Sequence, residues 1–180
     1  FSMAAASLFL PFLPLLPVQL LLLNFLSDIP SLAIAGDEVD AEQTRRPATW
    51  DIREVRRFLV LFGAVSTLFD LVMFAVLIWG FHADADAFRS AWFIESTLSE
   101  LLVLFSLRTA RPMFRSRPAA LLLGLSIAVG AVVTAIPFVP PVAGALALVP
   151  PALPVLAAAV AVALSYVAVN ELVKRAYARG

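Results

Sequence analysis

Long apolar stretches separated by short polar ones dominate the pattern of this chain. A stretch of about 20 apolar residues is long enough to cross a bilayer as a helix, and the sequence predicts five complete stretches of this kind after a shorter first one. We therefore expect an all-α, polytopic bundle of transmembrane helices with six membrane segments. The segments are expected over 1–12, 18–34, 58–81, 90–107, 119–138 and 153–172.

The first segment, 1–12, is too short to span a membrane. It begins at Phe1 with no basic residues before it, which does not fit a signal peptide. We expect it to be the truncated end of a helix, followed by a tight turn at 13–17, where Pro14 and Pro17 cannot continue the helix. A second proline-rich turn, 139–151, separates the last two segments.

The basic residues gather in alternate loops, and this pattern predicts the topology. All but one of the 13 Lys and Arg residues fall after the second segment, after the fourth segment or in the C-terminal tail. Only Arg89 lies in a loop of the other set. The positive-inside rule then places the basic loops and the C-terminus in the cytoplasm. Adding or removing one span would destroy the alternation.

Composition supports a membrane protein. Of the 180 residues, 62% are hydrophobic and 14% charged, whereas soluble domains are about 25% charged, and the mean hydropathy is +0.95. The lipid bilayer is thus the first partner, and a net charge of zero gives no support for a nucleic-acid partner. With no cysteine and a single histidine, His82, the chain cannot supply a thiolate or multi-histidine metal site.

One polar group interrupts the leucine run of the second segment. Asn24, Ser27 and Asp28 stand at i, i+3 and i+4, so on a helix their three oxygen-bearing side chains share one face. Oxygen ligands suit hard cations such as Mg²⁺ and Ca²⁺, and a carboxylate at membrane depth usually has a function. Pro30 disfavours helix at Ile29, and we expect local unwinding there to expose carbonyls to a bound ion. The alternative is that these side chains only hydrogen-bond a neighbouring helix.

Three more acids lie in predicted spans. Glu95 and Glu100 are five residues apart, about 140° around a helix, so they do not share a face. We expect one of them to approach the Asn24–Asp28 pair, and Glu95 is the stronger candidate for an additional cation ligand. For Asp70 we favour a structural, hydrogen-bonded carboxylate over a functional one.

The sequence also lacks the motifs of an ATP-hydrolysing domain. It contains no Walker A loop, no Asp-Lys-Thr-Gly phosphorylation motif and no glycine-rich nucleotide-binding pattern. This chain alone is therefore not expected to hydrolyse ATP.

A resemblance to a known family becomes specific at the second segment. A proline-flanked turn, a leucine run and then Asn-x-x-Ser/Thr-Asp resemble the hairpin of the fifth and sixth helices of P-type cation ATPases. In calcium pumps of that family the corresponding Asn, Thr and Asp bind the cation, so the resemblance assigns this role to Asn24, Ser27 and Asp28. Other stretches look more narrowly like the bacterial magnesium-importing members: 1–8, 14–24, 57–70, 90–96 and 107–109.

The resemblance covers the whole chain and carries several expectations. It implies that 1–180 is the C-terminal transmembrane domain, from the end of helix five through helix ten, of a magnesium-transporting P-type ATPase in the bacterial inner membrane. Mg²⁺ would be the transported ion, with Asn24 and Asp28 as ligands and Ser27 and Glu95 as possible helpers. The enzyme would be a translocase whose ATP and aspartyl-phosphate chemistry occurs in cytoplasmic domains absent from this chain, as are its N-terminal helices.

The residues leave alternatives open. Family members often have Tyr where this chain has Ser27, a small hydroxyl reminiscent of the calcium-pump threonine, so a pump for calcium or protons is one alternative. A stand-alone, non-enzymatic membrane module that uses its acids for packing is another. An ion-coupled secondary transporter often shows an inverted repeat, and none is visible here.

Overall fold

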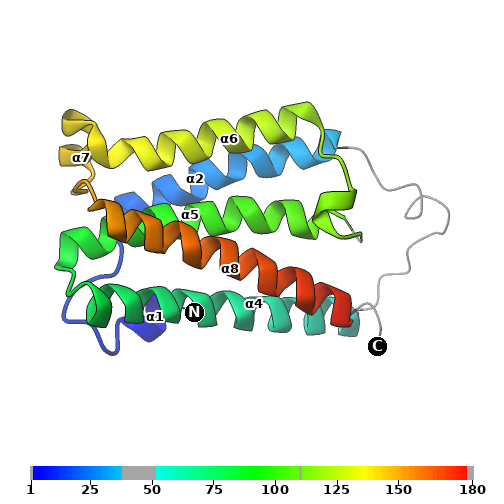
Figure 1. Cartoon of the computed structure of the whole chain (residues 1–180), viewed down its shortest axis with the longest axis horizontal. Helices are drawn as coiled ribbons and strands as arrows, with labels where there is room; N and C mark the ends of the chain where they lie inside the picture. The colour runs from blue at the N-terminus through cyan, green and yellow to red at the C-terminus, as the bar shows by residue number, and fades with distance from the viewer. Residues whose placement is uncertain (1, 38–51, 110, 178–180) are drawn as a thin grey trace.

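The computed structural model describes residues 2–37, 52–109 and 111–177, and all regular structure in them is helical (Figure 1). Among these residues, five helical stretches are long and apolar enough to cross a membrane. They cover Pro17–Gly36, Val55–Gly80, Ala85–Leu107, Ala120–Phe138 and Leu153–Tyr177. The predicted fold class, an all-α polytopic bundle, is confirmed, and the chain is a multi-pass membrane protein.

The helix bounds refine the predicted segments. The α-helices are α1 (Ser2–Ala6), α2 (Pro17–Ala33), α4 (Ile52–Ala75), α5 (Ala85–Leu107), α6 (Ala120–Ala135), α7 (Pro140–Ala145) and α8 (Leu153–Tyr177). α2 and α6 end in 3₁₀ turns, Ile34–Gly36 and Ile136–Phe138, α4 ends in a π-helical turn, Val76–Gly80, and another 3₁₀ turn, Met113–Arg115, follows α5.

Three predicted features differ from the structure for identifiable reasons. The first segment is helical only to Ala6, and prolines follow in the stretch leading to α2. α5 begins five residues earlier than predicted, because the Asp84 side chain caps it by accepting a 2.8 Å hydrogen bond from the Ala87 amide. The turn at 139–151 contains the short helix α7, which starts at a proline, and proline is well suited to a first helical position.

The spans run alongside one another with alternating direction (Figure 1). At one end of the bundle α2, α5 and α8 finish while α4 and α6 begin. We call this the basic end, because nearly all described basic residues lie in the helix ends and the loop there. They are Arg53, Arg56, Arg57, Arg108, Arg111, Arg115, Arg117, Lys174 and Arg175. Arg89 lies near the start of α5, at the opposite end, and the remaining basic residues, 45, 46 and 179, fall outside the described residues.

α5 is the central helix. It contacts α2, α4, α6 and α8, and 56% of its membrane window is buried, against 22–39% for the other four spans. Its buried face carries polar residues, among them Glu95, Ser99 and Ser106. Polar side chains are tolerated here because they face protein and not lipid. Towards the end opposite the basic end, Phe88 and Trp92 of α5 pack against Phe74 of α4.

The loops at the end opposite the basic end are tied to the spans by buried polar side chains. Gln19, which has no exposed surface, donates a 2.8 Å hydrogen bond to the carbonyl of Leu146 after α7, and its Oε1 accepts from the Leu16 amide. The Val149 amide donates to the Ser90 hydroxyl at 2.8 Å. These bonds attach the α7–α8 connection to α2 and α5.

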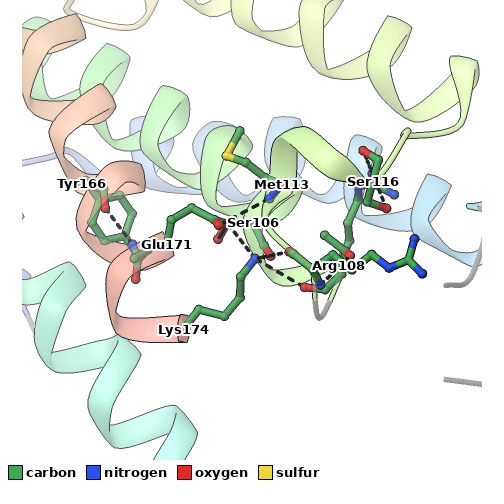
Figure 2. Close-up of polar contacts among 10 residues, drawn as sticks. Ser106, Arg108, Met113, Ser116, Tyr166, Glu171 and Lys174 are labelled. Carbon is green, nitrogen blue, oxygen red and sulfur yellow. Dashed lines mark hydrogen bonds and ion pairs between the residues drawn. The ribbon is translucent and has the colours of Figure 1, made fainter. Parts of the chain in front are cut away.

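A lysine joins the ends of α5 and α8 at the basic end (Figure 2). The Nζ of Lys174 donates to the carbonyls of Ser106 at 2.6 Å and Arg111 at 2.9 Å. It also pairs with Glu171 at 2.6 Å, and Glu171 accepts from the Ser106 hydroxyl at 2.6 Å. The last carbonyls of a helix have no hydrogen-bond partner within the helix. The ammonium group of Lys174, from α8, supplies a donor to the Ser106 carbonyl at the end of α5.

A second ion pair joins the segment that follows α2 to the end of α5. Arg108 pairs with Asp37, and both side chains are nearly buried, 1% and 6% exposed. Arg108 also donates to the Ser116 carbonyl at 2.8 Å, and Asp37 accepts from the Ala119 amide at 2.6 Å. The end of α2 is thereby attached to the start of α6.

Candidate functional site

α2 carries the polar group that the sequence singled out. Asn24 and Asp28 are exposed on its surface, whereas Ser27 is 3% exposed and donates a 3.1 Å hydrogen bond to the Asn24 carbonyl. In a membrane-spanning helix, an exposed amide and carboxylate on one face need a polar partner outside the helix. Because α2 is helical here, Asn24 and Asp28 lie on one exposed face of it.

The expected unwinding at Pro30 is wrong. α2 is α-helical from Pro17 to Ala33, through Pro30. Unwinding would strip several backbone groups of their partners in a medium without water, whereas proline removes only one donor. Serine hydroxyls supply further bonds to this stretch, since Ser31 donates to the Ser27 carbonyl at 2.9 Å. The structure shows no unwound carbonyls for an ion at this point of α2.

Glu100, and not Glu95, is the α5 acid that meets α2. Its carboxylate lies against the Ser27 hydroxyl and within electrostatic range of Asp28. Glu100 is an exposed residue. The α2 group thus gains a second carboxylate from the central helix.

Glu95 lies in a different environment. It is 1% exposed, and one of its oxygens accepts a 2.6 Å hydrogen bond from Ser99. Its other oxygen, Oε2, is buried with no hydrogen-bond partner among the described residues. Asp70 of α4 is the nearby charge that acts on it electrostatically.

Asp70 is held in place by two neighbours. It accepts hydrogen bonds from the Ser2 hydroxyl of α1 and from Nε1 of Trp92, the latter at 3.1 Å. These bonds fit the hydrogen-bonded, structural carboxylate that we favoured, although Asp70 also lines a cavity.

A polar cavity of ≈230 Å³ lies between α4, α5 and α8. Asn24, Ser27 and Asp28 are not among the residues that line it. Its lining includes oxygen-bearing side chains from all three helices: Ser66, Asp70, Glu95, Ser99, Glu100 and Tyr166. The four residues predicted as ligands therefore fall into two places, three on α2 and Glu95 in this cavity, with Glu100 bordering both.

Sequence reasoning missed the contribution of α8 to the cavity. Tyr166 was not singled out in the sequence analysis; it is 7% exposed and lies against Ser66 and Asn170. The buried Asn170, one turn after Tyr166 in an apolar segment, was the available signal. Among the described residues, no three His, Cys, Asp or Glu side chains lie close enough together to hold a metal ion directly.

The sequence matches the family described as "Cation transporting ATPase, C-terminus" over residues 12–176. This chain belongs to that family. The C-terminal region of cation-transporting ATPases is thus represented here by α2 to α8, and the resemblance inferred from the α2 motif is confirmed.

Several similar proteins carry the same name, "Magnesium-transporting ATPase, P-type 1". Those of Salmonella typhimurium LT2 and Escherichia coli K12 are each 38% identical to this cation-transporting ATPase region over 184 aligned positions, covering 99% of the chain. Another from S. typhimurium LT2 is 40% identical over 185 positions, covering 98%. The chain spans about a fifth, 20%, of the length of each of these relatives.

Proposed function

We propose that this chain is the membrane part of an ATP-driven magnesium transporter. The proposal rests on the similarity of this cation-transporting ATPase region to magnesium-transporting ATPases, which are 38% identical to it over 99% of its length. In addition, Asn24 and Asp28 lie together on one face of α2. ATP hydrolysis and the aspartyl-phosphate intermediate belong to parts of the longer protein outside this chain.

In this proposal Asn24 and Asp28 supply oxygens to the transported cation. A carboxylate at the bilayer centre costs about 2.5–3.5 kcal/mol on insertion scales, and binding a divalent cation offsets that penalty. Ser27 points its hydroxyl back to the Asn24 carbonyl, so its part is to orient this face. Glu100 stands against Ser27 and adds a carboxylate from α5, while Glu95 acts from the neighbouring cavity.

The proposed orientation follows the charges. The basic end lies on the cytoplasmic side of a bacterial inner membrane, and the C-terminal end of α8 is therefore also on that side. The proposed partners of this chain are the lipid bilayer, the Mg²⁺ ion, and the helices and cytoplasmic domains of the longer protein.

The test uses the full-length protein that contains this chain. Asp28→Asn keeps the size of the side chain and removes its charge, so we expect it to abolish Mg²⁺ uptake and Mg²⁺-stimulated ATP hydrolysis while membrane insertion stays intact. Asp86→Asn is the matched control, because Asp86 is 57% exposed and pairs with Arg89 near the start of α5. Near-normal Mg²⁺ uptake by Asp28→Asn would refute the assignment, and activation by Ca²⁺ alone would point to another cation.

A further inference from the structure

The lining of the cavity between α4, α5 and α8 is acidic. Asp70, Glu95 and Glu100 line it, and no lysine, arginine or histidine is among its lining residues. Glu95 is 1% exposed, and its Oε2 has no partner in the part of the chain that the structure describes. Unsatisfied buried polar oxygens are destabilising, so this arrangement calls for a ligand that donates hydrogen bonds and carries positive charge.

The size of the cavity indicates the form of that ligand. One water needs only about 10–15 Å³ of cavity volume measured with a water-sized probe, so a cavity of this size has room for an ion together with its waters. The cavity offers ≈230 Å³. A bare Mg²⁺ would need protein oxygens at about 2.1 Å in an octahedron, whereas no three of the described acids are close enough together to hold a metal directly.

We propose that this cavity binds a divalent cation with its water shell intact. The waters of the ion donate hydrogen bonds to the carboxylates of Asp70 and Glu95, and the hydroxyl oxygens of Ser66 and Tyr166 complete the polar wall. The proposal rests on the proposed function, because it concerns the same transported ion. It adds a second position, separate from Asn24 and Asp28, at which the ion is held without direct protein ligands.

The position of Glu100 connects the two places. Its carboxylate lines the cavity and lies against Ser27 beside Asp28. Mg²⁺ loses its waters reluctantly. The cavity would receive the hydrated ion, and the neighbouring Asn24–Asp28 face would offer direct ligands, so the ion would lose its waters in steps. Glu100 stands where the first direct ligand would replace a water.

The test uses hexaamminecobalt(III), a cation of similar size to hydrated Mg²⁺ whose six ligands do not exchange. Its binding to the purified full-length protein is measured by equilibrium dialysis without ATP, with Mg²⁺ as competitor. We expect the unaltered protein to bind it and Mg²⁺ to displace it. Asp70→Asn and Glu95→Gln, on two different helices, should each weaken binding about tenfold or more, because each removes one charge from the cavity wall. Asp28→Asn and the control Asp86→Asn should change it less than threefold.

The outcomes separate the two proposals. Equal affinity in the Asp70→Asn and Glu95→Gln variants, or no binding by an unaltered protein that transports Mg²⁺, would overturn the hydrated-ion cavity. An unaltered protein without Mg²⁺ uptake would instead overturn the proposed function. Thermal unfolding of both variants within a few degrees of the Asp86→Asn control ensures that lost binding reports the cavity and not a loss of fold.

Discussion

The Lys174 contact at the basic end gives a sharp prediction about stability. Replacing Lys174 with methionine keeps most of the side-chain length but removes the ammonium group that binds the Ser106 and Arg111 carbonyls. It also leaves Glu171, whose side chain is 8% exposed, without its cation. Figure 2 shows Lys174, Glu171 and Ser106 converging between the ends of α5 and α8.

The magnitude follows from the geometry. Two unit charges 2.6 Å apart attract by about 6 kcal/mol at an effective dielectric constant of 20. Desolvation of both groups offsets part of this attraction, and breaking a buried pair by removing one partner typically costs about 3–5 kcal/mol. Because the basic end lies close to water, which can hydrate the freed carbonyls, we expect about 3 kcal/mol, the lower end of that range.

The assay is a set of matched variants of the full-length protein, unfolded by SDS titration from mixed micelles. Arg175→Met is the control, because Arg175 is the neighbouring basic residue and is exposed. The double variant Glu171→Gln with Lys174→Met should be more stable than Lys174→Met alone, since it leaves no buried charge unpaired. If Lys174→Met unfolds at the same SDS fraction as Arg175→Met, the buried ion pair does not stabilise the bundle and the reasoning fails.

Three further predictions concern the rest of the bundle. Arg108→Met should destabilise the protein by about 3–5 kcal/mol, since Asp37 would stay buried without its cation; the loss should shrink when Asp37→Asn is added, and equal losses in both variants would contradict the pairing. Gln19→Leu should cost about 1–3 kcal/mol in the same titration, because it removes the donor to the Leu146 carbonyl, and an unchanged unfolding point would contradict the role of this bond. A fluorescent protein fused after Gly180 should fluoresce in bacteria and alkaline phosphatase fused there should be inactive; the reverse pattern would refute the proposed orientation.

The position of the spans could be predicted from the sequence because a bilayer makes each helix satisfy its own backbone. An apolar stretch of sufficient length therefore defines a span without knowledge of its neighbours, and the predicted bounds of α2 and α6 differ from the observed ones by few residues. Local chemistry moved the start of α5, where the Asp84 side chain caps the helix five residues before the predicted start.

The face of each helix could not be predicted in the same way. The rotation of α5 about its axis depends on its simultaneous packing against α2, α4, α6 and α8. The local sequence around Glu95 and Glu100 therefore could not show which of them lies near Asp28. The continuity of α2 through Pro30 likewise depends on what surrounds its backbone, and not on proline alone.

The sequence by itself determined which residue types stand at membrane depth, because transfer into lipid penalises each charge wherever its helix packs. It therefore identified Asn24, Asp28, Asp70, Glu95 and Glu100 as the residues to explain. Only the tertiary structure decided how they group: Glu100 beside α2, and Glu95 with Asp70 and Tyr166 around a separate cavity. The physical reason is that membrane insertion acts on single helices, whereas a cavity exists only where several helices fail to fill the space between them.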